Sequence, residues 1–136
     1  MINQDEVLAV RRAVRRILLV DDEESVLFAM HQYFSLRGHE VHRAADRESA
    51  ERLLDELPFD WVVTDLHLTP AREQDGLSVG RKASDTCAER VVLLTSHRTS
   101  DVDREAKLAG IDRVLAKPVT LPDLELLLET TCEGQP

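Results

Sequence analysis

Short runs of apolar residues recur along the chain, and polar positions follow each run. The clearest of these runs are residues 17–20, 61–64 and 91–94. Runs of this length, without alternation of apolar and polar positions, are typical of strands that are buried on both faces. Residues 41–44 and 114–116 form weaker runs, as expected of edge strands with one face nearer to water. The pattern therefore predicts five strands.

The segments between these runs carry apolar residues at helical spacing. Three sets show it best: Leu27, Met30 and Phe34; Ala50, Leu53 and Leu57; and Leu121, Leu124 and Leu128. Gly38 and Gly110 stand where two of the helices would end, and Thr120, followed by Asp123, has the pattern of a helix start. Strands that alternate with helices through short connections imply right-handed crossovers and a parallel sheet covered on both faces. The predicted fold class is a doubly wound α/β sheet.

Length and charge indicate one domain with two short ends. A chain of 136 residues is long enough to bury its own core, and we assign residues 16–131 to that domain. Residues 1–15 form an N-terminal extension, helical or flexible, and residues 132–136 form a tail. The first 16 residues hold four arginines against two acidic residues, so this segment is basic. It is either a simple leader, which is the plainer interpretation, or a docking element.

The rest of the chain is acidic, which limits its partners. The net charge of −9 would repel a phosphate backbone, so direct nucleic-acid binding is not expected. Cys87 and Cys132 form no CxxC pair and no cluster with histidine, which argues against a disulfide framework or a zinc site. No stretch has the features of a signal peptide or a membrane span, so we expect a cytoplasmic protein that makes no membrane contact.

Polar side chains gather where the predicted strands end. They are Asp21, Asp22, Asp65, Thr95 and Lys117. Ligands of doubly wound sheets bind outside the carboxyl ends of the strands, so we expect these residues to meet there. Three carboxylates at one place would repel each other unless a cation lay among them, and Mg²⁺ prefers oxygen ligands. A second interpretation is that Asp21 and Asp22 only cap the following helix, although Asp65 has no helix directly after it.

These residue types also suit phosphoryl transfer. Asp65 can act as a nucleophile toward phosphorus if a metal and a cation neutralise the oxygens of the transferring group. Lys117 is the candidate cation, and the Thr95 hydroxyl can bond a phosphoryl oxygen. Pro118, directly after Lys117, predicts a fixed turn in which a cis peptide is plausible.

Five motifs follow one another along the chain. They are Leu18-Leu19-Val20-Asp21-Asp22-Glu23, Val62-Val63-Thr64-Asp65-Leu66, Asp75-Gly76-Leu77, Leu93-Leu94-Thr95-Ser96, and Ala109-Gly110-Ile111-Asp112 leading to Leu115-Ala116-Lys117-Pro118. In this order and spacing they resemble the response-regulator receiver family, and the resemblance extends from Arg16 to Glu129. The resemblance implies a flavodoxin-like (βα)5 fold with strand order 2-1-3-4-5.

The resemblance also implies a role for each candidate residue. Asp65 would be the phosphoacceptor, and Thr95 and Lys117 would contact the phosphoryl group. Mg²⁺, or Mn²⁺ in its place, would be held by Asp21, Asp22, Asp65 and the backbone carbonyl of His67. The phosphodonor would be a histidine kinase or a histidine phosphotransfer protein, and the signal would pass to a downstream protein that the sequence does not identify.

The sequence departs from the family pattern at three places. The loop of residues 66–74 is longer than usual, and Pro70 is displaced in it by one position. Val114 stands where the family commonly has a Tyr or Phe that switches rotamer, so no ring is present to move. His67 and His97 occupy positions whose side chains tend to overhang the phosphoryl group, where they would modulate hydrolysis. The alternative for both histidines is that they are ordinary solvated loop residues.

The leading hypothesis is a free-standing receiver that catalyses its own phosphorylation and dephosphorylation but acts mainly as a switch. A second is a receiver fragment of a larger regulator or hybrid kinase. A third is a haloacid-dehalogenase-like phosphatase, because residues 65–69 resemble its DxDxT motif, although His67 replaces the second acid. We set aside a dinucleotide-binding module, because residues 21–23 are acidic where a glycine-rich turn would be needed.

Overall fold

Five parallel strands form one sheet in a computed structural model of the chain, which describes residues 14–68, 75–86 and 88–129. They are β1 (Arg16–Val20), β2 (Glu40–Ala44), β3 (Trp61–Asp65), β4 (Arg90–Thr95) and β5 (Arg113–Ala116). Their order is β2-β1-β3-β4-β5, with β3 in the centre and the two weaker runs at the edges, as the sequence predicts. The predictions for residues 1–13, Pro70, Cys87 and the tail lie outside the described residues.

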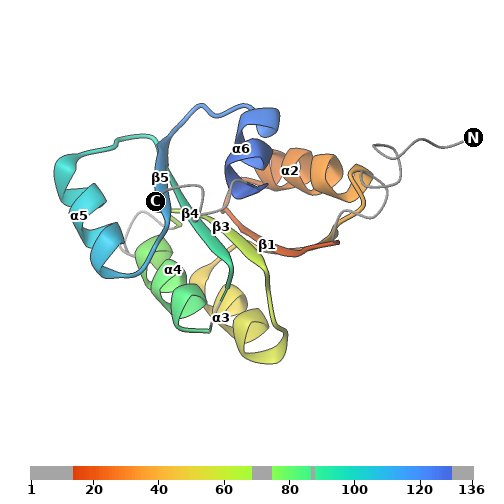
Figure 1. Cartoon of the computed structure of the whole chain (residues 1–136), viewed down its shortest axis with the longest axis horizontal. Coiled ribbons are helices and arrows are strands. Elements are labelled where there is room, and N and C mark those ends of the chain that lie inside the picture. Colours follow the sequence, from red (N-terminus) through yellow and green to blue (C-terminus); the bar gives the residue numbers. More distant parts are fainter. Residues whose placement is uncertain (1–13, 69–74, 87, 130–136) are drawn as a thin grey trace, which may run out of the picture.

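A helix follows each strand and covers one face of the sheet. The described helices are α2 (Glu24–Leu36), α3 (Arg47–Glu56), α4 (Asp75–Asp85), α5 (Ser100–Leu108) and α6 (Leu121–Glu129). In Figure 1, α2 and α6 lie together on one side of the sheet, and α3 and α4 lie on the other. None of these helices has the length and apolar character needed to cross a membrane.

Alternate residues of the strands build two cores, one on each face. Along β1, Ile17 and Leu19 pack with α2 and α6, whereas Leu18 and Val20 pack with α3 and α4. This division requires inner strands that are apolar on both faces, which explains the continuous apolar runs of β1, β3 and β4.

The helix predicted from the spacing of Ala50, Leu53 and Leu57 is present as α3, and Leu54 adds to its apolar face. The buried residues of this helix are Ala50 and Leu54, while Leu53 and Leu57 are half-buried at its margin. Leu57 is the C-cap residue with an extended backbone, and its side chain packs against the same core as Ala50 and Leu54.

The predicted helix ends are confirmed. Gly38 and Gly110 adopt positive φ angles of 96° and 86°, a conformation that favours glycine. The Thr120 hydroxyl accepts a hydrogen bond from the Asp123 N–H at 3.3 Å at the start of α6. The peptide bond between Lys117 and Pro118 is cis. Because all five strands are parallel, their carboxyl ends meet at one edge of the sheet.

Candidate functional site

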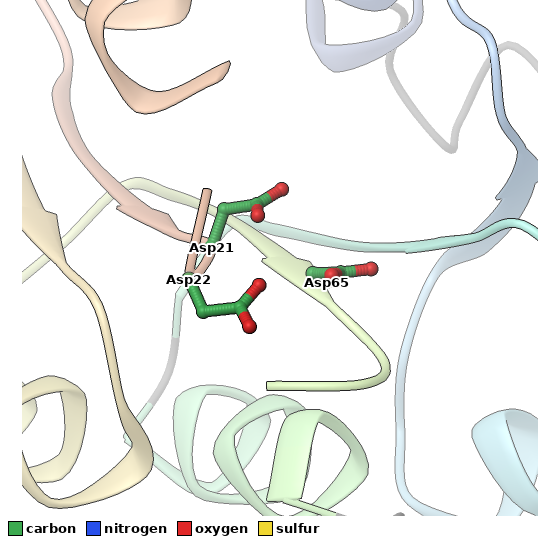
Figure 2. Close-up of side chains that lie close together, drawn as sticks. All are labelled: Asp21, Asp22 and Asp65. Carbon is green, nitrogen blue, oxygen red and sulfur yellow. The ribbon is translucent and has the colours of Figure 1, made fainter. Parts of the chain in front are cut away.

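Three aspartates meet at the carboxyl edge of the sheet. Asp21 and Asp22 directly follow β1, and Asp65 ends the neighbouring strand β3. Their carboxylate oxygens lie within 4.8 Å of one another, and Figure 2 shows the three side chains extending into the same space. Asp21 and Asp65 are buried, with exposed fractions of 1% and 7%, whereas Asp22 is exposed. The predicted gathering of acids is therefore present in the structure.

Neither Asp21 nor Asp22 is the N-cap of the following helix. The N-cap of α2 is Glu23, whose side chain makes no capping hydrogen bond. Asp21 accepts a hydrogen bond from the Glu23 N–H at 2.9 Å, which lies before the first turn of the helix. The interpretation that these two acids serve only as helix caps therefore does not account for their placement.

Lys117 reaches the acids from the loop after β5. Its Nζ lies 3.3 Å from Oδ1 of Asp65 and 3.4 Å from Oδ2 of Asp21. Burial alone would lower the pKa of Lys117, but the charges of Asp65 and Asp21 and its hydrogen bonds to them outweigh that effect and raise this pKa. Lys117 therefore remains a cation between two buried carboxylates.

Asp65 has an electrostatic environment that disfavours its ionised form. Burial raises the pKa of its carboxyl group, and the negative charges of Asp21 and Asp22 raise it further. The Lys117 charge and hydrogen bond act in the opposite direction without cancelling the shift. A cation bound among the three acids would restore the ionised form that a nucleophile requires.

Thr95 ends β4, one residue after Leu94, which pairs with Asp65 in the sheet. Its side chain is fully buried, and its hydroxyl oxygen accepts a hydrogen bond from the His97 N–H at 3.1 Å. The hydroxyl still has its own proton to donate to another acceptor. The Thr95 carbonyl accepts a hydrogen bond from the Lys117 N–H at 2.8 Å, so Thr95 and Lys117 are held together by backbone contact.

The remaining predicted residues surround this group. His67 and His97 are exposed, and both line a hollow of about 210 Å³ between the loop after β3 and the start of α5. Two polar residues that the sequence did not single out, Thr99 and Glu105, line the same hollow. Val114 lies half-buried on β5 against the core. Gly76 belongs to the motif Asp75-Gly76-Leu77, but the sequence alone predicts no role for this glycine.

The donor set suits a hard divalent cation. Carboxylate oxygens and a backbone carbonyl are the ligands that Mg²⁺ and similar ions prefer, and close carboxylates reduce their repulsion by sharing such an ion. Asp21, Asp22 and Asp65 supply these oxygens within one small space, and the exposure of Asp22 leaves a path to solvent. Among the described residues, no histidine or cysteine joins this cluster, which argues against a site built for zinc.

Comparison with known proteins connects this geometry to a family. The model of the response regulator receiver domain matches residues 17–129. The chain is 29% identical over 124 residues to the regulatory protein AtoC of Escherichia coli, covering 90% of this chain and 26% of that protein. It is 35% identical over 112 residues to the alginate biosynthesis transcriptional regulatory protein AlgB of Pseudomonas aeruginosa, covering 82% of this chain and 24% of that protein. The chain thus spans about a quarter of the length of these two relatives.

Solved structures agree with this match. A response regulator protein from Burkholderia pseudomallei, crystallised with a phosphorylated aspartic acid, a calcium ion and citrate, has a TM-score of 0.77 at 26% identity, covering 85% of this chain and 67% of that one. A CheY-like receiver domain protein from Methanospirillum hungatei has the same fold, with a TM-score of 0.78 at 24% identity over 86% of this chain and 92% of that one. The chain belongs to the response regulator receiver domain family of two-component systems.

Proposed function

We propose that Asp65 accepts a phosphoryl group from a phosphohistidine of a histidine kinase or a histidine phosphotransfer protein, with Mg²⁺ or Mn²⁺ bound beside it. One observation carries this proposal. A buried carboxylate at the end of the central strand faces two further acids and a lysine, an arrangement that costs stability and suits a phosphoryl group accompanied by a divalent ion. The metal ligands would be Asp21, Asp22, Asp65 and the His67 carbonyl.

The transfer itself is a displacement at phosphorus. An oxygen of the Asp65 carboxylate forms a bond to phosphorus while the bond between phosphorus and the donor nitrogen breaks. The electron pair returns to that nitrogen, and the imidazole leaves as a neutral ring if its other nitrogen carries a proton. When bound, the divalent ion supplies positive charge to the phosphoryl oxygens and to the acids.

Lys117 and Thr95 would hold the transferred group. The Lys117 ammonium, already 3.3 Å from Asp65, would pair with a phosphoryl oxygen in place of the carboxylate. The Thr95 hydroxyl would donate its proton to a second oxygen. These contacts neutralise charge that is present during the transfer, which is the main contribution that proteins make to phosphoryl transfer.

Hydrolysis would return the protein to its starting state. The oxygen of a water molecule attacks phosphorus, the bond to Asp65 breaks, and the products are inorganic phosphate and the free carboxylate. His67 and His97 line one hollow next to the loop after Asp65, where their side chains would modulate the approach of that water. Replacing each by Ala and following the loss of label would measure this effect.

The output would be protein contacts rather than direct binding to nucleic acid, in line with the acidic charge of the chain. Since AtoC and AlgB are about four times as long as the matched region, a receiver within a longer regulator is the alternative to a free-standing switch.

Phosphorylation would draw Thr95 and Lys117 inward and shift residues 96–101 and the loop after Asp65. Val114 has no ring, so β5 would respond less. Backbone amide chemical shifts, measured with and without a phosphoryl mimic, test whether the two loops respond more than β5. A largest change at Val114 and α6 would contradict this expectation.

The decisive experiment is incubation with a small phosphodonor and Mg²⁺, followed by measurement of intact mass. The wild-type protein should gain one phosphoryl group, and the gain should require the metal. Asp65→Asn should abolish labelling, whereas Asp60→Asn, at the opposite edge of the sheet, should retain it. Stoichiometric labelling of Asp65→Asn would refute the assignment. Continued turnover of phosphate esters without a stable labelled form would favour the phosphatase.

A further inference from the structure

The backbone directly after Asp65 lies against the first turn of α4 at Gly76. A Cβ atom built on Gly76 would overlap the Asp65 carbonyl oxygen and would lie 2.6 Å from the Cα and carbonyl oxygen of Leu66. All of these atoms belong to the backbone, so no rotation of a side chain could relieve the overlap. The contact therefore requires glycine at this position.

The same short stretch of backbone is held by hydrogen bonds from three directions. The Gly76 N–H donates to the Leu66 carbonyl at 3.0 Å, and the Leu66 N–H donates to the Leu94 carbonyl of β4 at 2.8 Å. The Thr64 hydroxyl donates to the Asp65 carbonyl at 3.1 Å. The backbone of Asp65 and Leu66, which leads to the His67 carbonyl, is thus held by hydrogen bonds from β4, from α4 and from β3 itself.

We propose that Gly76 is a positioning residue for phosphoryl transfer. Its missing side chain lets α4 hold the backbone after Asp65 in the one place where the Asp65 carboxylate and the His67 carbonyl can share a metal ion. This role rests on the proposed function. Groups that orient metal ligands have large effects on metal binding without touching the metal, and small displacements of a reacting group strongly slow a reaction.

Gly80, one turn later in the same helix, provides a matched control. A Cβ atom on Gly80 would also be crowded, but by the Cγ1 and Cδ1 atoms of Ile111, at 2.9 and 2.5 Å. These are side-chain atoms of a residue that makes none of the backbone contacts that hold Asp65 and Leu66, and they can move by a change of rotamer. Gly76→Ala and Gly80→Ala carry the same change in helix propensity and differ mainly in what the new methyl group displaces.

The test compares Mg²⁺ binding and the rate of labelling by a small phosphodonor in the wild-type protein and the two variants. Urea denaturation without Mg²⁺ first establishes that each variant is folded under the assay conditions. Gly76→Ala should weaken Mg²⁺ binding by about tenfold or more and should still label more slowly at saturating Mg²⁺. Gly80→Ala should change both measurements much less than Gly76→Ala does, even if its stability falls. A role in stability alone would not produce this difference in metal affinity and labelling among folded proteins.

Two results would overturn the positioning role alone. One is a Gly76→Ala protein with wild-type Mg²⁺ affinity and labelling rate, when the wild type itself is labelled. The other is an equal loss of Mg²⁺ affinity and labelling rate in Gly76→Ala and Gly80→Ala. A wild-type protein that neither binds Mg²⁺ nor accepts label would instead overturn the proposed function and this role with it. If Gly76→Ala does not fold, the wild-type amide resonances decide. Addition of Mg²⁺ and beryllofluoride should shift the Gly76 amide, which is bonded to Leu66, more than the Gly80 amide, and an equal or smaller shift would refute the role.

Discussion

At the carboxyl edge of the sheet Asp21, Asp22 and Asp65 face one another, whereas at the amino edge Asp60 and Asp112 each accept a backbone hydrogen bond. The Arg16 N–H donates to Asp60 at 2.8 Å, and the Val91 N–H donates to Asp112 at 2.7 Å. These two N–H groups belong to the first residue of β1 and the second residue of β4, and each needs an acceptor where its strand begins. Aspartate therefore completes the hydrogen bonding of the sheet at one edge.

The ion pairs of the two edges differ in the same way. At the amino edge, Arg16 pairs with Glu40 at 2.7 Å, and the Glu40 pKa falls to about 2 because of hydrogen bonds from Arg16 and His42. At the carboxyl edge, the pKa of Asp65 is raised by burial and by its acidic neighbours. At the amino edge the charged groups pair with one another, whereas the carboxyl edge keeps an excess of negative charge that a ligand can neutralise.

Lys117→Met should have the largest effect on stability. It removes the cation that lies between Asp21 and Asp65 and leaves their charges buried without it. We expect the free energy of unfolding without Mg²⁺ to fall by about 2 kcal/mol, less than for a fully buried pair because a quarter of the Lys117 side chain is exposed. Added Mg²⁺ should recover much of the loss in urea denaturation. A variant as stable as the wild type would show that Lys117 does not compensate these acids.

Asp60→Ala should destabilise the protein by about 1–2 kcal/mol, because it leaves the Arg16 N–H without its acceptor. Asp60→Asn keeps an acceptor oxygen and should lose less. Neither variant should change the response to Mg²⁺, since Asp60 lies at the opposite edge from the acidic cluster. Equal losses in the two variants would indicate that the charge of Asp60, rather than its hydrogen bond, stabilises the amino edge.

The fold could be predicted because its three inner strands carry continuous apolar runs and because glycines follow the ends of two helices, α2 and α5. The apolar run that begins at Trp61 predicts a central strand, which the structure contains as β3. The positive φ angles of Gly38 and Gly110 explain why glycine stands at the ends of two helices. The face of α3 was less clear, because Leu53, Leu54 and Leu57 all fit a helical period and only the sheet decides which are buried.

The acidic cluster could also be predicted, since parallel strands bring their carboxyl ends to one edge. The hollow shared by His67 and His97 could not be predicted, because it depends on how two loops and α5 pack. The contact of Gly76 with Asp65 was hidden for a similar reason. The sequence shows a glycine after an aspartate, but only the packed helix shows that the backbone of another segment occupies the space of a side chain.

We expect His39 to make the stability of the amino edge depend on pH. Its ring is buried between Phe34 and Trp61, and its Nδ1 accepts a hydrogen bond from the Arg15 N–H at 3.0 Å. Burial lowers the pKa of His39, with a further contribution from the positive charges of Arg15 and Arg37. The negative charges of Glu125 and Glu129 on α6 oppose this shift without cancelling it. The folded protein therefore favours neutral His39.

A folded state that favours the neutral ring loses stability when the pH falls. The contribution of His39 should be fully present above its ordinary pKa of about 6.5 and should decrease as the pH drops below that value. The Gln side chain in His39→Gln cannot titrate, so the difference in unfolding free energy between wild type and variant should change as the pH falls below about 6.5. A difference that is constant with pH would mean that His39 is not held neutral.

Asp22→Asn should give the smallest effect and should be opposite in sign to Asp60→Ala. Asp22 is the exposed member of the acidic cluster, so its loss relieves repulsion on Asp21 and Asp65 while water already screens much of its charge. Without Mg²⁺ we expect the melting temperature to rise by about 2 °C. With Mg²⁺ the order should reverse, because the wild-type protein has one more carboxylate with which to bind the ion and gains more from it. Thermal unfolding of both proteins with and without Mg²⁺ measures the four values. If Asp22→Asn is not more stable than the wild type without the metal, the repulsion among the three aspartates is too weak to distinguish the carboxyl edge from the amino edge.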